Sequence, residues 1–223
     1  MAYPAIAEHR LERLLQEVRQ LPEARHSVRF PEWYLRQWHF HPDGYLSRAA
    51  VRRYEVVIDR LYNAGRRRPV DRAVVAAVSD AEPAAIVEVG CGTGRLVATL
   101  GEKFPGAQVT GVDLSPRMLE RARQRVGDAP NVELVHADAA SGAHPLKADA
   151  VLAVHVLGHT PRDMAAAILE NASTIAGANG RVITVDHRWH RAPAVPRNLQ
   201  IWRRQRLLGG LLMLREYRRV QGG

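Results

Sequence analysis

A glycine-rich turn that joins a short apolar segment to a helical one constrains this chain more than any other feature. Residues 86–95 read IVEVGCGTGR, with Gly90, Gly92 and Gly94 at alternate positions. Glycine has no Cβ, so such a turn adopts conformations that other residues avoid and lets backbone N–H groups approach a ligand closely. The turn therefore predicts a strand–loop–helix unit that binds a nucleotide-like molecule.

Segments of two kinds alternate around this turn. Apolar runs predict strands at 84–90, 108–113, 131–138, 148–156 and 181–187. Helices are predicted at 93–103, 115–126 and 161–177, the second capped by Ser115 with Pro116 at its first position. Strands that alternate with helical segments form βαβ units, and fully apolar strands are buried on both faces. We predict an α/β fold built on a doubly wound, mostly parallel sheet.

The chain divides into three regions of different charge. Net charge is +3 over residues 1–83, −2 over the alternating core at 84–187, and +8 over the extension at 188–223. The first region shows helical spacing at 5–21, 47–63 and 70–79 and contains no convincing strand. Most of the positive charge therefore lies in a C-terminal extension outside the predicted core.

Length and composition limit the cellular setting. The 223 residues are 46% hydrophobic, enough for a sizeable core, and they contain no run of 18 apolar residues. The N-terminus mixes acids and bases and lacks the apolar segment of a signal peptide. Cys91 is the single cysteine, so an internal disulfide is excluded. These features predict a cytoplasmic protein without a transmembrane helix.

Residues beyond the turn distinguish two classes of nucleotide-like ligand. Dinucleotide-binding turns read G-x-G-x-x-G, and the third glycine of that pattern falls on Arg95. Asp113 ends the second predicted strand about 20 residues past the turn, where an acid accepts hydrogen bonds from ribose hydroxyls. Its alternative role is a stabilising acid at the start of the next helix, before Ser115. Asp138 ends the third strand, where the alternative is an ordinary loop acid.

Several of these motifs resemble those of one enzyme family. The segment EVGCGTG at 88–94 is similar to the first motif, E/D-x-G-x-G-x-G, of class I S-adenosylmethionine (SAM)-dependent methyltransferases. Residues 153–187 resemble a later stretch of the family, with Gly158 replacing the first histidine of a pair and Ala178-Asn179-Gly180 replacing Pro-Gly-Gly. The resemblance covers residues 84–187 and is greatest to small-molecule enzymes of the quinone-biosynthesis and natural-product type. It implies a Rossmann-like sheet, an N-terminal helical lid and SAM as the cofactor.

The resemblance also implies roles for residues at the ends of the predicted strands. It places Glu88 beside the glycine loop and the methionine amino group of SAM. Asp113 meets the ribose, while Asp138 and the Ala139 N–H meet the adenine. The predicted cofactor-binding residues are Tyr54, Glu88, Gly90, Cys91, Gly92, Asp113, Leu114, Met118, Asp138, Ala139 and His155. Trp33, Tyr34, Trp38, His39, Phe40, His41 and Tyr45 are expected to cover the cofactor or an apolar acceptor, or to pack as an ordinary core.

Histidines at the ends of the fourth and fifth predicted strands are the candidate catalytic groups. Methyl transfer needs a base only where the acceptor must lose a proton, and histidine titrates near neutral pH. The candidates are His159, His155 and His187, with His190 close by. His159 aligns with the second histidine of the family's pair; the alternative is that strand-end histidines serve packing. No metal is predicted, because His39 and His41 have no third ligand at metal-site spacing.

Missing motifs constrain the acceptor. No N/D-P-P-Y/F motif follows the fourth strand, which argues against enzymes that methylate amino groups of nucleic acids. Cys91 lies inside the glycine loop, which argues against a cytosine-C5 enzyme, since that reaction needs a cysteine nucleophile. The main hypothesis is methyl transfer to O, N or C of a small molecule. The alternatives are an RNA methyltransferase that uses the basic extension, and a SAM-binding protein without methyl transfer.

The C-terminal extension allows two structures. Residues 197–223 form either a Gly-Gly hairpin or a broken basic helix whose arginines and leucines suit peripheral contact with a membrane surface. Because so few residues follow the fifth strand, we expect the sheet to lack one or both of the family's last strands. An exposed edge then favours a homodimer or cover by the N-terminal helices. The expected partner is a small-molecule acceptor rather than nucleic acid.

Overall fold

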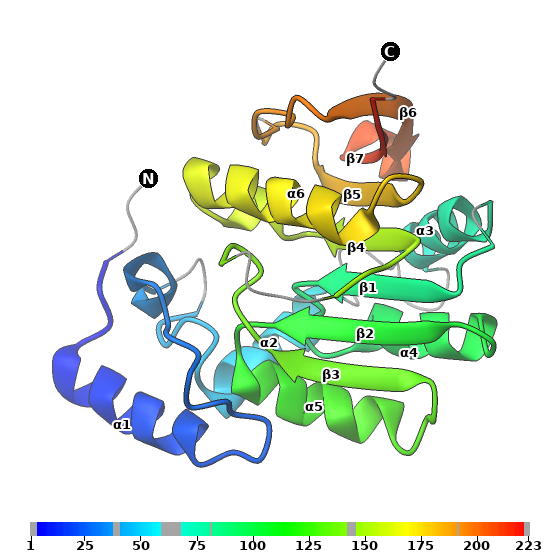
Figure 1. Ribbon diagram of the computed structural model, residues 1–223. Helices are drawn as coiled ribbons and strands as arrows, with labels where there is room; N and C mark the ends of the chain where they lie inside the picture. The colour runs from blue at the N-terminus through cyan, green and yellow to red at the C-terminus, as the bar shows by residue number, and fades with distance from the viewer. Residues whose placement is uncertain are drawn as a thin grey trace.

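A seven-stranded sheet with the order β3-β2-β1-β4-β5-β7-β6 forms the centre of the molecule (Figure 1). The computed structural model describes residues 4–37, 41–58, 68–80, 82–141, 146–190 and 192–220. The strands are β1 (Ala85–Val89), β2 (Gln108–Asp113), β3 (Val132–His136), β4 (Ala150–Val154), β5 (Arg181–His187), β6 (Leu199–Leu207) and β7 (Leu212–Arg219). Strands β1 to β5 run parallel, and the β6–β7 hairpin joins β5 in the antiparallel direction. The predicted α/β fold with a doubly wound, mostly parallel sheet is confirmed.

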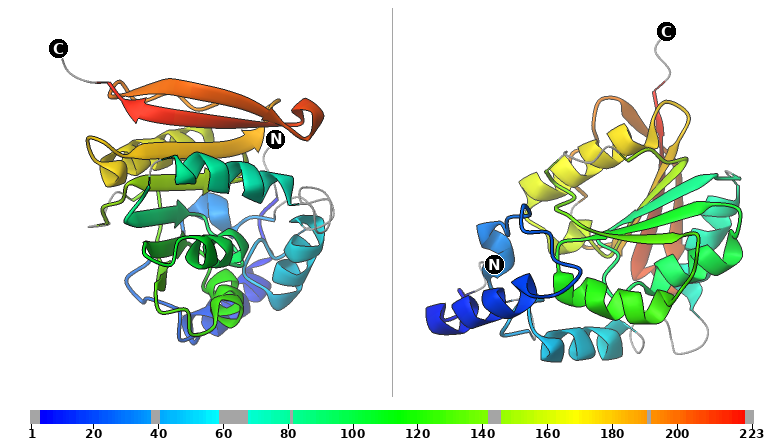
Figure 2. Two further views of the ribbon diagram at one scale, coloured as in Figure 1. Left: turned by 90° about the vertical axis from the view of Figure 1, so that its right-hand side faces the viewer. Right: turned by 60° about the horizontal axis from the view of Figure 1, so that its bottom comes forward.

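Helices cover both faces of the sheet, as the unbroken apolar character of the strands requires. One face packs against α3 (Pro69–Ser79), α4 (Arg95–Lys103) and α5 (Pro116–Val126), and the other against α6 (Arg162–Ala176) (Figure 2). The start of α5 is fixed as predicted, because Ser115 Oγ accepts a hydrogen bond from the Met118 N–H at 3.2 Å. All five residues of β4 are buried between the two layers.

The N-terminal region packs around its own small core beyond the carboxyl ends of β1, β2 and β3 (Figure 1). It contains α1 (Glu8–Arg19), a 3-10 helix at Glu32–Leu35 and α2 (Arg48–Val57), which Ser47 caps through the Ala50 N–H. Ligands of open α/β sheets bind outside the carboxyl ends of the strands. The N-terminal region therefore lies at the edge where sheets of this kind bind ligands, and its role as a lid stays a prediction. Trp38, His39 and Phe40 of its aromatic segment lie outside the described residues.

The C-terminal extension is a β-hairpin, and the expectation of a reduced sheet is wrong. Strands β6 and β7 are both present, and β7 pairs with β5 along seven residues from Arg181 to His187. Gly209 and Gly210 make the turn with φ of +63° and +94°. A right-handed helix cannot continue through residues with positive φ, so these glycines favour the hairpin. Leu212, Leu214 and other leucines of the segment bury in the sheet core instead of forming one face of a helix. The alternative of a broken basic helix is therefore also wrong, whereas peripheral contact with a membrane surface stays a prediction.

Strand β6 ends the sheet with a charged edge. Three arginines of β6, Arg203, Arg204 and Arg206, are exposed, and Trp202 is 58% exposed beneath Arg218 at 4.0 Å. Charged side chains on an outer strand oppose pairing with a second sheet. A homodimer stays a prediction. Among the described residues no helix is long and apolar enough to span a bilayer.

Candidate active site

The three glycines of the turn have backbone angles that favour glycine, and neighbouring atoms leave little space for a Cβ at these positions. Gly90, Gly92 and Gly94 have φ of +69°, +54° and +71°. A Cβ on Gly90 would lie 2.3 Å from a methyl group of Val156, and one on Gly94 would lie 2.7 Å from the Ala122 Cβ. The Tyr54 hydroxyl lies 3.0 Å from the Cβ position of Gly92. The loop is thus a close-fitting cradle between the lid, α5 and the end of β4.

Asp113 holds this cradle through its carboxylate. Its Oδ2 accepts a hydrogen bond from the Gly92 N–H at 2.8 Å, and its Oδ1 accepts one from the Ser115 N–H at 2.8 Å. The carboxylate therefore contacts both the glycine loop and the start of α5, and its role at the ribose stays a prediction. Burial raises the pKa of Asp113 to about 6, although these backbone N–H groups favour the charged form.

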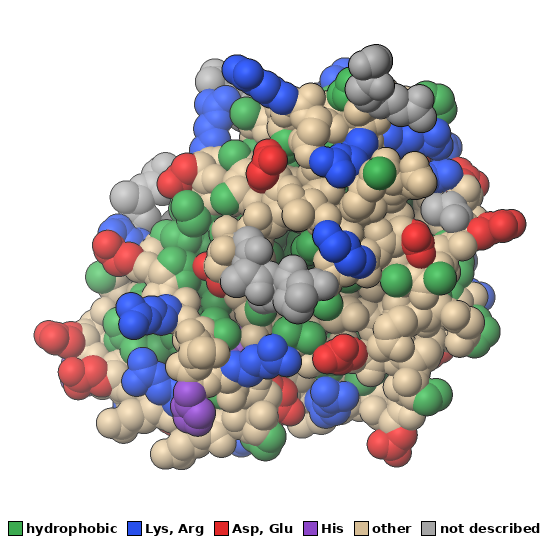
Figure 3. All heavy atoms as spheres, viewed as in Figure 1, with side chains coloured by type: hydrophobic (Ala, Val, Ile, Leu, Met, Phe, Trp, Pro, Cys, Tyr) green, Lys and Arg blue, Asp and Glu red, His purple; other side chains and the backbone are tan. Residues whose placement is uncertain are grey.

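Two adjoining cavities open at the carboxyl ends of the strands, and Tyr54, Gly90 and His155 line both of them. Hydrophobic side chains surround a hollow in the middle of this face (Figure 3). Every predicted cofactor-binding residue lines one cavity or both: Tyr54, Glu88, Gly90, Cys91, Gly92, Asp113, Leu114, Met118, Asp138, Ala139 and His155. Trp33, Tyr34 and Tyr45 add aromatic walls from the lid. The individual roles of these residues stay predictions, but the structure brings all of them together.

Glu88 presents an unsatisfied oxygen at the wall of the smaller cavity. The residue is 3% exposed, and its Oε2 has no hydrogen-bond partner among the described residues. Burial raises the pKa of this carboxyl well above its usual value, while the nearby Arg95 guanidinium opposes the shift. A buried acceptor without a partner is costly, so a cationic group bound in this cavity would be stabilised by Glu88.

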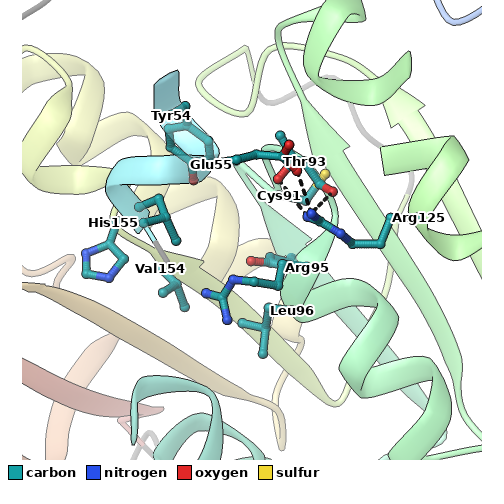
Figure 4. Close-up of a pocket in the computed structure, with 12 residues that line it drawn as sticks. Tyr54, Glu55, Cys91, Thr93, Arg95, Leu96, Arg125, Val154 and His155 are labelled. Atoms are coloured by element: carbon teal, nitrogen blue, oxygen red, sulfur yellow. Dashed lines mark hydrogen bonds and ion pairs between the residues drawn. The ribbon is translucent and has the colours of Figure 1, made fainter. Parts of the chain in front are cut away.

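An ion-pair network that the sequence did not reveal connects the lid to the glycine loop. Arg125 of α5 donates to both the carbonyl and the hydroxyl oxygen of Thr93, each at 2.8 Å (Figure 4). The same guanidinium pairs with Glu55 of α2 at 2.5 Å, and Arg121 approaches Glu55 at 3.1 Å. Glu55 and Arg125 are 70 residues apart in sequence, so no local pattern indicates that they pair.

Replacing Arg125 with alanine is expected to lower the free energy of unfolding by about 2 kcal/mol, since hydrogen bonds to charged groups contribute about 1.5–3 kcal/mol. Urea unfolding measures this change, and amide exchange in α2 should become faster. The matched control is Arg123→Ala on the exposed side of the same helix, with an effect below about 0.5 kcal/mol. Equal effects of the two substitutions would show that the network adds nothing.

Histidines gather where β4 and β5 end. The ring centres of His187 and His190 are 5.3 Å apart, and those of His159 and His190 are 5.6 Å apart. His155 and His159 line the larger cavity, whereas His187 is 7% exposed behind them and stacks on Trp189 at 4.3 Å. Burial and the neighbouring histidines lower the pKa of His155 to about 3. His155 is therefore a weak base, and His159 is the better placed of the three predicted catalytic residues.

The lid histidine His41 does not reach this cluster. It is 6% exposed and packs against Tyr45, with ring centres 5.5 Å apart. His39 lies outside the described residues. In the part of the chain that the structure describes, no group of three or more His, Cys, Asp or Glu residues has the geometry of a metal site.

Comparison with known proteins decides the family. Residues 87–182 match a family model described as a methyltransferase domain. The chain carries a class I SAM-dependent methyltransferase domain. This domain is 52% identical over 48 residues to malonyl-[acyl-carrier protein] O-methyltransferase of Anoxybacillus flavithermus, a match that covers 22% of this chain and 18% of the relative. It is 44% identical over 69 residues to trans-aconitate 2-methyltransferase of Streptomyces coelicolor, with 30% and 23% covered.

The fold is shared with a solved protein structure. The crystal structure of magnesium protoporphyrin IX methyltransferase from Synechocystis PCC 6803 with bound SAH superposes with a TM-score of 0.63 at 19% identity, covering 79% of this chain and 97% of that one. Its likeness therefore concerns the fold. The chain spans only about a fifth of the length of the two curated relatives.

The cofactor of the methyltransferase domain is SAM, and the residues present fit this molecule. The unpartnered Glu88 oxygen suits the methionine amino group, and the cradle at Gly90 and Gly92 leaves no room for a Cβ. Asp113 and Asp138 line the larger cavity together with Gly90 and Gly92, and their contacts with the ribose and adenine stay predictions. The predicted Rossmann-like fold and the predicted cofactor are confirmed.

Proposed function

We propose that this chain is a SAM-dependent methyltransferase that transfers a methyl group to a small-molecule acceptor. One observation carries the proposal: the cavity that holds the cofactor residues continues to His155 and His159, where an acceptor meets the cofactor. The two sequence relatives are named for O-methylation of malonyl-[acyl-carrier protein] and for methylation of trans-aconitate. These names favour an oxygen acceptor. A cytoplasmic location, which the single free cysteine favours, is part of the proposal.

The residues around the cavity bind and orient rather than react. Bound SAM supplies an electrophilic methyl group on its sulfonium sulfur, so the protein's task is to align the reactants and exclude water. Asp113 holds the glycine cradle through the Gly92 N–H, Glu88 lines the smaller cavity, and Tyr54 covers Gly92 from the lid. Trp33 and Tyr34 close the side opposite the sheet with apolar surface. Burial keeps the Cys91 pKa well above its usual value, so this thiol is not a nucleophile.

Titration calorimetry with SAM tests the proposal, with NAD as the control ligand. We expect SAM binding, no NAD binding, and at least tenfold weaker SAM binding by the Glu88→Gln variant. Labelled methyl transfer to a metabolite extract then tests catalysis. Comparable affinity for NAD, or no affinity for SAM, would contradict the proposal. Binding without transfer to any metabolite would instead support the hypothesis of a SAM-binding protein that is not a methyltransferase.

The exposed arginines of β6 sustain one second candidate, an RNA methyltransferase. Arg203, Arg204 and Arg206 lie along one exposed strand, and RNA binding through them would depend steeply on salt. Because β6 is part of the sheet, the test is substitution rather than deletion. We expect the triple variant with serine at these positions to retain small-molecule methyl transfer within twofold. If the wild-type protein methylates RNA, and the triple variant loses both this activity and the salt-sensitive binding of RNA, the second candidate would be favoured.

A further inference from the structure

We propose that His159, which lines the cavity, binds a carboxylate group of the acceptor, and that His187 and His190, packed beside it, complete the binding site. This inference rests on the proposed methyltransferase function and deepens it by naming the chemical class of the acceptor.

Gly158 and His190 occupy one site together. A Cβ on Gly158 would lie 2.0 Å from the His190 Nδ1 and 2.9 Å from two further ring atoms, so the imidazole lies directly against the glycine backbone. His190 follows β5, whereas Gly158 follows β4. The absence of a side chain at position 158 therefore makes room for an imidazole that arrives from the neighbouring loop.

Hydrogen bonds hold the two loops in this arrangement. The Gly158 N–H donates to the Asp186 Oδ1 at 2.9 Å, and the His190 N–H donates to the His187 carbonyl oxygen at 3.1 Å. Asp186 is 5% exposed on β5. The position of the His190 ring is thus fixed by the ends of two adjacent parallel strands, and this rigidity suits a binding site.

The cluster has the chemistry of an anion site. The ring centres of His159, His187 and His190 lie within 5.3–6.4 Å of one another, so an anion bound beside one imidazole can accept N–H hydrogen bonds from a second. Trp189, 62% exposed, stacks on His187 at an interplanar angle of 22° and stabilises a positive charge there. A carboxylate is already ionised and needs no base, so these histidines bind the acceptor rather than deprotonate it.

The two roles differ in their pH dependence. The other titratable or charged groups that the structure places around the cluster are His155, Asp186, Arg95 and Arg215. An anion site loses its charge as pH rises, so the acceptor KM should increase above neutral pH while kcat stays constant. If one of these histidines acted as a general base instead, its protonation would lower kcat as pH falls.

Competition binding to the SAH-saturated enzyme tests the inference. The probes are malonate, trans-aconitate and benzoate, each paired with its neutral methyl ester. We expect at least one acid to bind at least tenfold more tightly than its ester, and His190→Ala to remove this preference while SAH affinity stays within twofold. The exposed His9→Ala variant is the matched control and should change neither affinity.

Two further variants separate binding from folding. Gly158→Ala displaces the His190 ring and should reproduce the loss seen in His190→Ala. The double variant Gly158→His/His190→Ala supplies an imidazole from the other loop and should recover acid binding to within about threefold. Equal binding of every acid and its ester, or no effect of His190→Ala on acid binding, would overturn the inference. Failure of the wild-type protein to bind SAM or SAH would instead overturn the proposed function.

Discussion

Replacing Asp113 with alanine lowers the affinity for SAM by about a hundredfold, which corresponds to about 3 kcal/mol. The variant loses the carboxylate expected to accept the ribose hydroxyls, and it also leaves the Gly92 N–H without its 2.8 Å acceptor. Both losses act on binding, because the glycine loop must keep its shape for SAM to approach the backbone. Calorimetry measures the affinity, and the exposed Asp128→Ala variant at the end of α5 is the control. Similar affinities in these two variants would contradict a role for Asp113 at the ribose.

The raised pKa of Asp113 adds a pH dependence with two opposite signs. Burial moves the pKa from the ordinary 3.8 to about 6, so the folded protein binds this proton more tightly than the unfolded chain does. The contribution of Asp113 to stability is therefore greatest below pH 4 and is lost as pH rises through 6. SAM affinity changes in the other direction, because only the ionised carboxylate accepts both ribose hydroxyls.

Comparison of wild type with Asp113→Asn between pH 4 and pH 8 separates these effects. The difference in unfolding free energy should move in favour of the asparagine variant as pH rises through 6, measured by urea unfolding at each pH. Wild-type SAM affinity should rise over the same interval, whereas that of the variant should stay flat. A wild-type affinity that is independent of pH across 6 would contradict the assignment.

Local patterns predicted the core because each of its elements is specified by neighbouring residues. Ser115 and Pro116 fix the start of α5. The unbroken apolar run AVLAV is typical of a strand that is buried on both faces, as β4 is. The order of the strand ends then placed Glu88, Asp113 and Asp138 at two adjoining cavities, since carboxyl ends of parallel strands share one edge.

Features that depend on long-range pairing could not be predicted in this way. The leucines of residues 199–214 fit a helix face and two strands equally well, and only pairing with β5 selects the hairpin. The pair of Glu55 with Arg125 joins helices that no local pattern relates. The contact of Gly158 with His190 joins two loops in the same way. In each case the partners are far apart in sequence, so only the tertiary structure shows that they are in contact.

Replacing Asp71 with asparagine is expected to lower the free energy of unfolding by about 3–4 kcal/mol. Asp71 of α3 forms an ion pair with Arg95, the first residue of α4, and their side chains are only 3% and 15% exposed. Removing one charge of a buried pair leaves the other without compensation, and such changes cost about 3–5 kcal/mol. Urea unfolding measures the loss.

Asp80→Asn provides the matched control, because Asp80 is 58% exposed and approaches Arg203 at 3.7 Å in an ordinary surface pair. Its effect should stay below about 1 kcal/mol. The double variant Asp71→Leu/Arg95→Met removes both charges and should recover most of the lost stability, since apolar replacements of a buried pair are often neutral. The Asp71→Asn variant should also have a different affinity for SAM, because the Arg95 guanidinium then acts on the Glu88 carboxyl without the opposing charge of Asp71. Equal losses in Asp71→Asn and Asp80→Asn would mean that the buried pair contributes no more than a surface one.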